Sequence, residues 1–125
     1  LNSITFYEGS DPGELTLENL TALKTVSYWA ADVNKQHLEA LVGLPVLTHL
    51  EISGTPLDDD AAQVIPRLST LTELRASSHF SLEGLKQIGQ LPSLQRLDLY
   101  HTDESDWTPE QAKLMFSSIR DVTVW

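Results

Sequence analysis

An apolar pattern that recurs every 22 to 25 residues constrains the fold of this chain more than any other feature. Its clearest copy is LTHLEISGTPL, with apolar residues at Leu47, Leu50, Ile52 and Leu57. Six segments align on it: Leu1–Tyr7, Leu23–Trp29, Leu47–Ser53, Leu71–Ser77, Leu94–Tyr100 and Ile119–Trp125. A second apolar register lies three residues before the last five segments, at Leu20, Leu44, Leu68, Leu91 and Phe116. Such a repeat predicts a solenoid of stacked units that bury one continuous core.

The alternation inside each segment predicts a short strand with one buried and one exposed face, since successive side chains point to opposite sides. We expect four pairs to point inward: Val26 and Tyr28, Leu50 and Ile52, Leu74 and Ala76, and Leu97 and Leu99. A parallel neighbour can be reached only through a crossover of about a dozen residues or more. The chain should therefore fold as one α/β domain over 1–125, a right-handed coil with six short parallel strands on its concave face and short helices on its convex face.

Local signals place the helices and turns between these strands. Asn34 can cap a helix that runs to about Val42 and ends at Gly43. Before the second strand we expect a turn over Glu8–Gly13 and a helical turn over Leu15–Leu20. We expect a further helix that Asp58–Asp60 opens and Pro66 stops, and another that Ser81 caps. The last expected helix has Thr108 as its N-cap, Pro109 at its first position and Gln111 three residues after the cap.

Composition excludes several classes of function. The formal net charge of -10 opposes binding to phosphate backbones, so we expect no nucleic-acid partner. No apolar run approaches the roughly 18 residues of a membrane span. The chain has no cysteine, which excludes disulfides and cysteine-based zinc sites but leaves the compartment open.

The sequence contains little that indicates a catalytic or metal-binding site. The chain has no nucleophile elbow, no glycine-rich phosphate loop and no H-E-x-x-H pair, so we expect neither an enzyme nor a cofactor. Three aspartates at Asp58–Asp60 suit a helix N-terminus better than a cation site. His79 and His101, with Asp103 close by, could in principle share a metal; a role as turn residues is the better interpretation.

The repeated segments resemble the leucine-rich-repeat family over nearly the whole chain. Within it, GTPLDDDA and YHTDESD resemble the subclass, common among bacterial members, with Thr in place of the ladder Asn. The resemblance implies a non-catalytic scaffold that binds a protein or peptide on its concave strand face.

The outward positions of the strands supply the candidate binding residues. Glu51, Arg75 and Asp98 alternate in sign along one expected row, and Glu73, Arg96 and Asp121 along another. We expect both rows to form ion-pair ladders. The third row has serines in its middle and aromatic residues toward both ends: Tyr7, Trp29, Ser53, Ser77, Tyr100 and Trp125. The predicted partner-binding residues are Tyr7, Trp29, His49, Glu51, Glu73, Arg75, Arg96, Asp98, Tyr100 and Trp125.

Two other functions stay open at this point. The acidic charge suits an inhibitory or immunity-like protein that blocks a basic partner. The strands Leu1–Tyr7 and Ile119–Trp125 would leave open sheet edges, which suits a spacer within a larger protein. We therefore expect the native protein to continue beyond one or both ends, or oligomer contacts to cover them.

Overall fold

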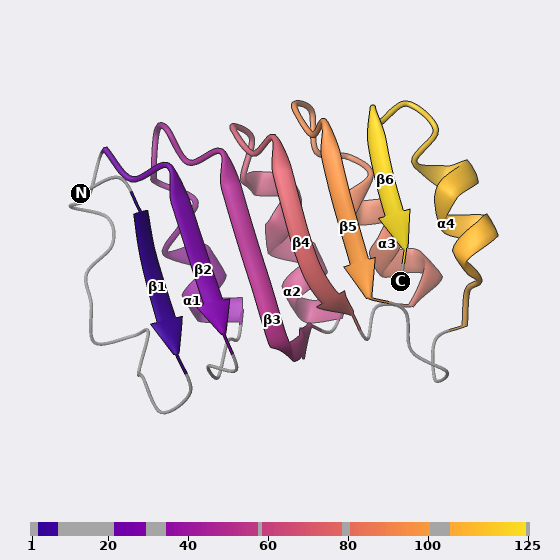
Figure 1. The fold of residues 1–125 in the computed structure, drawn as a ribbon, viewed down its shortest axis with the longest axis horizontal. Helices are drawn as coiled ribbons and strands as arrows, with labels where there is room; N and C mark the ends of the chain where they lie inside the picture. Colours follow the sequence, from indigo (N-terminus) through magenta and orange to yellow (C-terminus); the bar gives the residue numbers. More distant parts are fainter. Residues whose placement is uncertain are drawn as a thin grey trace.

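Parallel strands in sequence order form a single sheet, and short helices lie behind it (Figure 1). A computed structural model describes residues 3–7, 22–29, 35–57, 59–78, 81–100 and 106–124. Within them the strands are β1 (Ser3–Tyr7), β2 (Thr25–Trp29), β3 (His49–Leu57), β4 (Glu73–Ser78), β5 (Arg96–Tyr100) and β6 (Asp121–Val124). The helices are α1 (Lys35–Glu39), α2 (Asp59–Val64), the 3-10 helix η3 (Ile65–Arg67), α3 (Leu82–Ile88) and α4 (Pro109–Met115).

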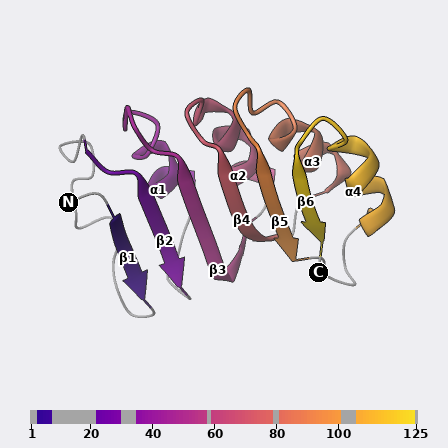
Figure 2. The same cartoon turned by 45° about the horizontal axis from the view of Figure 1, so that its top comes forward.

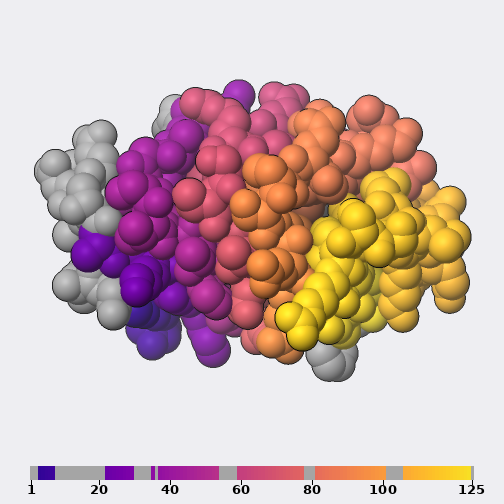
Figure 3. All heavy atoms as spheres, turned by 90° about the horizontal axis from the view of Figure 1, so that it is seen from above, coloured from indigo at the N-terminus to yellow at the C-terminus, as the bar shows by residue number. Residues whose placement is uncertain are grey.

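Each repeat lies beside the next one along the long axis of the molecule. In the tilted view of Figure 2 the helices again lie behind the strands. From above, the repeats follow one another in chain order, from purple to yellow (Figure 3). The expected α/β solenoid with helices on one side of a six-stranded parallel sheet is confirmed. None of the helices in the described segments has the length and apolar character of a membrane span.

The strand register follows the spacing of the repeats. One row of paired residues contains Val26, Leu50, Leu74 and Leu97, and another contains Tyr28, Ile52, Ala76 and Leu99. All eight side chains are buried, as the alternation predicts. The leading leucines Leu23, Leu47, Leu71 and Leu94 are buried as well. This apolar surface stabilises each repeat on its neighbours by about 25 cal/mol for every Å² removed from water.

Tyr28 places a hydroxyl group inside this core. Its ring stacks on Phe6 of β1, with the ring centroids 5.1 Å apart and the planes inclined by 11°. The Tyr28 hydroxyl has no hydrogen-bond partner within the described part of the chain. Burial raises the pKa of this phenol far above its usual value, because a phenolate here would lose its hydration.

Helix α1 ends at Glu39, earlier than the expected Val42. Beyond it the Leu41 N–H donates to the Leu38 carbonyl at 3.0 Å, and the Leu44 N–H donates to the Leu41 carbonyl at 3.1 Å. Such bonds between residues three apart belong to tight turns, in which every third side chain points the same way. Leu38, Leu41 and Leu44 are all buried. The tighter turn therefore fits their spacing, and Gly43 does not end the α-helix.

The α-helix expected to stop at Pro66 ends at Val64, and a 3-10 helix that contains Pro66 follows it. Helix α2 passes at Ile65 into η3, and Pro66 lies in the first turn of this 3-10 helix. Proline is tolerated there, since an N–H at the start of a helix has no intrahelical acceptor.

The caps of the last two helices are confirmed. Ser81 Oγ accepts from the Gly84 N–H at 3.3 Å at the start of α3. Thr108 and Gln111 form a capping box at α4: the Gln111 N–H donates to Thr108 Oγ1 at 3.2 Å, and the Thr108 N–H donates to Gln111 Oε1 at 2.8 Å. The turns expected over Glu8–Gly13 and Leu15–Leu20 lie outside the described residues.

Trp107 is a core residue that the repeat pattern missed, with only 2% of its surface exposed. It stands directly before the N-cap Thr108, at the position where an apolar residue often packs against the fourth helical residue. That fourth residue is Ala112, which is also buried. This staple pattern is the signal that could have identified Trp107.

Candidate functional site

The strand face, which is the side of the sheet turned away from the helices, carries its outward side chains in rows. The first row is Ser3, Thr25, His49, Glu73, Arg96 and Asp121, and the second is Thr5, Ser27, Glu51, Arg75, Asp98 and Thr123. Both agree with the expected alignment residue by residue. The third row is broken, because the register of β3 against β4 shifts after Ile52 and leaves Ser53 and Ser77 unpaired with each other.

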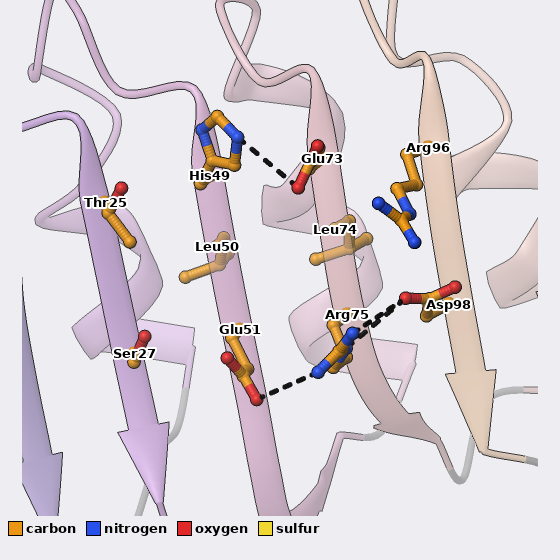
Figure 4. A pocket seen from close by; sticks show the side chains of 10 residues that line it. All are labelled: Thr25, Ser27, His49, Leu50, Glu51, Glu73, Leu74, Arg75, Arg96 and Asp98. Atoms are coloured by element: carbon orange, nitrogen blue, oxygen red, sulfur yellow. Dashed lines mark hydrogen bonds and ion pairs between the residues drawn. The ribbon is translucent and has the colours of Figure 1, made fainter. Parts of the chain in front are cut away.

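Arg75 joins carboxylates from both neighbouring strands (Figure 4). Its Nε and Nη2 donate to Oδ2 of Asp98 at 3.3 and 3.2 Å, and its Nη1 lies 3.6 Å from Oε1 of Glu51. The hydrogen bond to Asp98, with a further contribution from the charge of Glu51, raises the pKa of the Arg75 guanidinium above its usual value. The expected ladder Glu51–Arg75–Asp98 is thus present, and it fixes one cation between two anions.

Asp98 is the least accessible member of this ladder. Its side chain is 9% exposed, against 26% for Glu51 and 45% for Arg75. The Asp98 carboxylate therefore depends on Arg75 for compensation of its lost hydration, whereas Arg75 keeps contact with water.

The second expected ladder, Glu73–Arg96–Asp121, does not form. Oε2 of Glu73 lies 3.3 Å from Nε2 of His49, on the opposite side from Arg96. Within the described segments, no ion pair joins Arg96 to Glu73 or to Asp121. Alternation of positive and negative charge along a row does not determine which ion pairs form, because each side chain has a neighbour on both adjacent strands.

Exposed aromatic side chains border the charged rows. Tyr7, Trp29 and Tyr100 are 61%, 49% and 37% exposed. Tyr7 and Trp29 are register neighbours, whereas Trp29 and Tyr100 lie three strands apart, roughly 14 Å at the usual strand spacing. Trp125, the other aromatic residue predicted for this row, lies outside the described residues.

A hollow of about 170 Å³ lies on the strand face over Leu50 and Leu74 (Figure 4). Its lining includes six of the predicted site residues, namely His49, Glu51, Glu73, Arg75, Arg96 and Asp98. Thr25 and Ser27 of β2 also line it. They belong to the same two rows but were not among the predicted binding residues.

The chemistry of the hollow is that of polar recognition. It offers guanidinium donors, carboxylate acceptors and hydroxyl groups, and its volume lies below the roughly 300 Å³ at which small-molecule pockets begin. No group of three histidine or carboxylate side chains in the described segments is arranged to hold a metal ion. His79, His101, Asp103 and Asp58, which were considered as metal ligands, lie outside those segments.

Comparison with known proteins supports the fold. No protein-family model and no curated protein matches the chain. Among solved structures, the chain is similar to an internalin from Listeria monocytogenes, with a TM-score of 0.55 and 20% sequence identity. The match covers 94% of this chain and 39% of the internalin chain, so this chain spans less than half of that protein. With the in-register parallel sheet, this likeness assigns the chain the α/β fold of a leucine-rich-repeat solenoid.

Proposed function

We propose that the chain is a non-catalytic module that binds a protein or peptide on its strand face. The observation that carries this proposal is the presence of exposed Trp29 and Tyr100 beside a fixed charge pattern, Glu51–Arg75–Asp98. Tryptophan, tyrosine and arginine are enriched among the few residues that carry most of the binding energy at protein interfaces.

The size of the hollow supports a macromolecular partner. A volume of about 170 Å³ is enough for a single side chain and too small for a typical metabolite. A partner lying across several strands would insert one side chain there and cover the aromatic residues at the same time. The ion pairs would then determine orientation and specificity more than affinity.

The double variant Trp29→Ala/Tyr100→Ala tests this proposal. We expect the double variant to keep the parent's circular dichroism spectrum. Its binding free energy for the natural partner should be weaker by more than about 1 kcal/mol for each hot-spot residue. The partner is first captured from an extract of the source cell, identified and purified, and affinity is then measured by calorimetry. Leu114→Ala is the matched control, since Leu114 is 78% exposed on α4, away from the strand face. If the control loses binding and the double variant does not, then the helix side is the working surface.

A second candidate is an inhibitory protein that blocks a basic partner. The net charge of -10 favours it, and so does the strand face, on which Glu51, Glu73, Asp98 and Asp121 outnumber Arg75 and Arg96. In that case association should slow markedly as salt rises from about 50 to 500 mM, because electrostatic steering is screened. A rate independent of salt would exclude this version.

A further inference from the structure

Glu73 lies between two basic side chains and bonds to only one of them. In the register of the sheet, Glu73 of β4 is paired with His49 on one side and with Arg96 on the other. Its Oε2 lies 3.3 Å from His49 Nε2, while the Arg96 guanidinium has no ion-pair partner in the described part of the chain. Glu73 and Arg96 both line the hollow, and Figure 4 shows the Arg96 side chain extended toward β4.

The hydrogen-bond directions around His49 depend on how many protons its ring carries. Nδ1 lies 2.7 Å from Thr48 Oγ1, and the Thr48 hydroxyl is placed to donate to the Lys24 carbonyl at 3.3 Å. If that hydroxyl proton goes to Lys24, His49 must donate through Nδ1 to Thr48 and through Nε2 to Glu73. Only an imidazolium carries both protons. A neutral ring can keep Glu73 through an Nε2–H, but Thr48 must then donate to Nδ1 and give up Lys24.

We propose that Arg96 anchors an acidic side chain of the partner, and that His49 regulates this anchor by drawing Glu73 away from it. When His49 is protonated, Glu73 stays with β3 and the Arg96 guanidinium is available to an incoming carboxylate. When His49 loses its proton, Arg96 becomes the stronger attraction for Glu73, which then competes with the partner for the same donors. The inference rests on the proposed role of the strand face and names one group that this face recognises.

The other charged groups around these three side chains do not supply the switch. They are Lys24 beside the start of β2, Glu51 on β3, Arg75 on β4, Asp98 on β5, and Arg120 and Asp121 at β6. Glu51, Arg75 and Asp98 are engaged with one another. Carboxylates, lysine and arginine as classes keep their charge between about pH 5.5 and 8, whereas histidine changes its charge within that interval.

A small probe tests the anchor without the natural partner. N-acetyl-glutamic acid α-amide carries one side-chain carboxylate, and N-acetyl-glutamine α-amide is its neutral control. Binding is followed through the arginine ¹³Cζ resonances at about pH 5.5 and 8, an interval chosen to span histidine titration. We expect the acidic probe to shift Arg96 and to bind about 2- to 5-fold more weakly at the higher pH, the range of an exposed ion pair. The neutral probe should shift nothing.

Three variants separate the anchor from a general charge effect. Arg96→Gln should lose the probe, whereas Arg67→Gln, which removes an equal charge from η3, should not. At both pH values, Glu73→Gln should bind the acidic probe at least as well as the parent does at about pH 5.5. His49→Gln should bind the acidic probe at both pH values as weakly as the parent does at about pH 8. If Glu73→Gln keeps the parent's pH dependence, then His49 acts through its charge alone and the regulation is overturned. If Arg96→Gln still binds the probe, the anchor is overturned.

The proposed function and this inference can fail separately. Trp29→Ala should leave probe binding unchanged, because Trp29 does not line the hollow. A natural partner that docks on the helix side would refute the proposed function while the probe still reports an anchor at Arg96. A partner weakened by Trp29→Ala/Tyr100→Ala, with no probe binding at Arg96, would refute only the anchor.

Discussion

Asp59 and Ser81, which begin helices in successive repeats, are joined by two hydrogen bonds. The Ser81 N–H donates to Asp59 Oδ1 at 2.8 Å, and the Ser81 hydroxyl donates to Asp59 Oδ2 at 2.6 Å. One repeat further on, the Leu82 N–H donates to Asp106 Oδ1 at 2.8 Å. Carboxylates in this part of the fold therefore accept hydrogen bonds from N–H groups of a neighbouring repeat. The sequence had suggested only that the aspartates would satisfy N–H groups of their own helix.

Removal of this link should destabilise the contact between α2 and α3. We expect Asp59→Ala to lower the free energy of unfolding by about 1 kcal/mol, the usual scale for a lost cap or hydrogen bond. Asp60→Ala is the matched control, because Asp60 is exposed in the same turn and should change stability by less than about 0.5 kcal/mol. Urea unfolding measures both. Equal losses in the two variants would show that helix-dipole charge matters and the Ser81 bonds do not.

Leu50→Ala should cost about 2–5 kcal/mol of unfolding free energy. Leu50 is 2% exposed in the middle of the sheet, where a cavity would weaken packing on both neighbouring repeats. Leu114→Ala removes the same atoms from an exposed site and should stay within about 0.5 kcal/mol. A thermal melt of Leu50→Ala that matches the parent would contradict the assignment of Leu50 to the core.

The ladder around Arg75 should respond unequally to truncation. Arg75→Ala would leave the Asp98 carboxylate, 9% exposed, without a cation and should cost about 1–3 kcal/mol. Glu51→Ala leaves that pair intact, so its cost should be near that of an exposed ion pair, about 0–1 kcal/mol. Chemical denaturation of both variants at low salt makes the comparison. Equal costs would mean that Asp98 is hydrated well enough without Arg75.

Tyr28 should make stability fall at alkaline pH. Burial raises the pKa of its phenol in the folded state above the 10.0 of an ordinary tyrosine. The unfolded chain therefore releases this proton first, so stability is full below pH 10.0 and declines as the pH rises toward the folded-state pKa. Urea midpoints measured between about pH 9 and 11 should fall more steeply for the parent than for Tyr28→Phe.

Tyr28→Phe also tests the buried hydroxyl at neutral pH. Since this hydroxyl has no partner in the described residues, its removal should be neutral or stabilising. Tyr100→Phe is the control, because Tyr100 is exposed and should leave the alkaline slope unchanged. A parent and a Tyr28→Phe variant with parallel pH profiles would show that the phenol is hydrated.

The fold was predictable because two independent signals agree. Alternation within each segment determines which side chains point inward, and the repeat length determines which residues become neighbours, so the rows through Leu50 and Glu51 could be written from the sequence alone. Helix ends were less predictable. The end of α1 depends on how Leu38, Leu41 and Leu44 pack in a tight turn, and a local capping signal such as Gly43 does not report packing.

The candidate site was predictable only in part. Its positions follow from the register, but the partner chosen by each side chain does not. Glu73 has basic neighbours on both sides, and the contact with His49 depends on rotamers and on the hydrogen bonds of Thr48. Charge alternation in the sequence therefore identified the ladder at Arg75 and misassigned the one at Arg96.

The unequal repeat lengths have a consequence for how such a protein can change. Strand starts are 22 to 25 residues apart in the sequence, yet the first two outward rows stay in register across all the strands. Insertions and deletions are thus absorbed by the connecting segments and do not move the side chains that face a ligand. The length of the connecting segments and the identity of the outward side chains can therefore change independently. New specificities can arise by substitution of outward residues alone, because the strand register keeps their positions fixed.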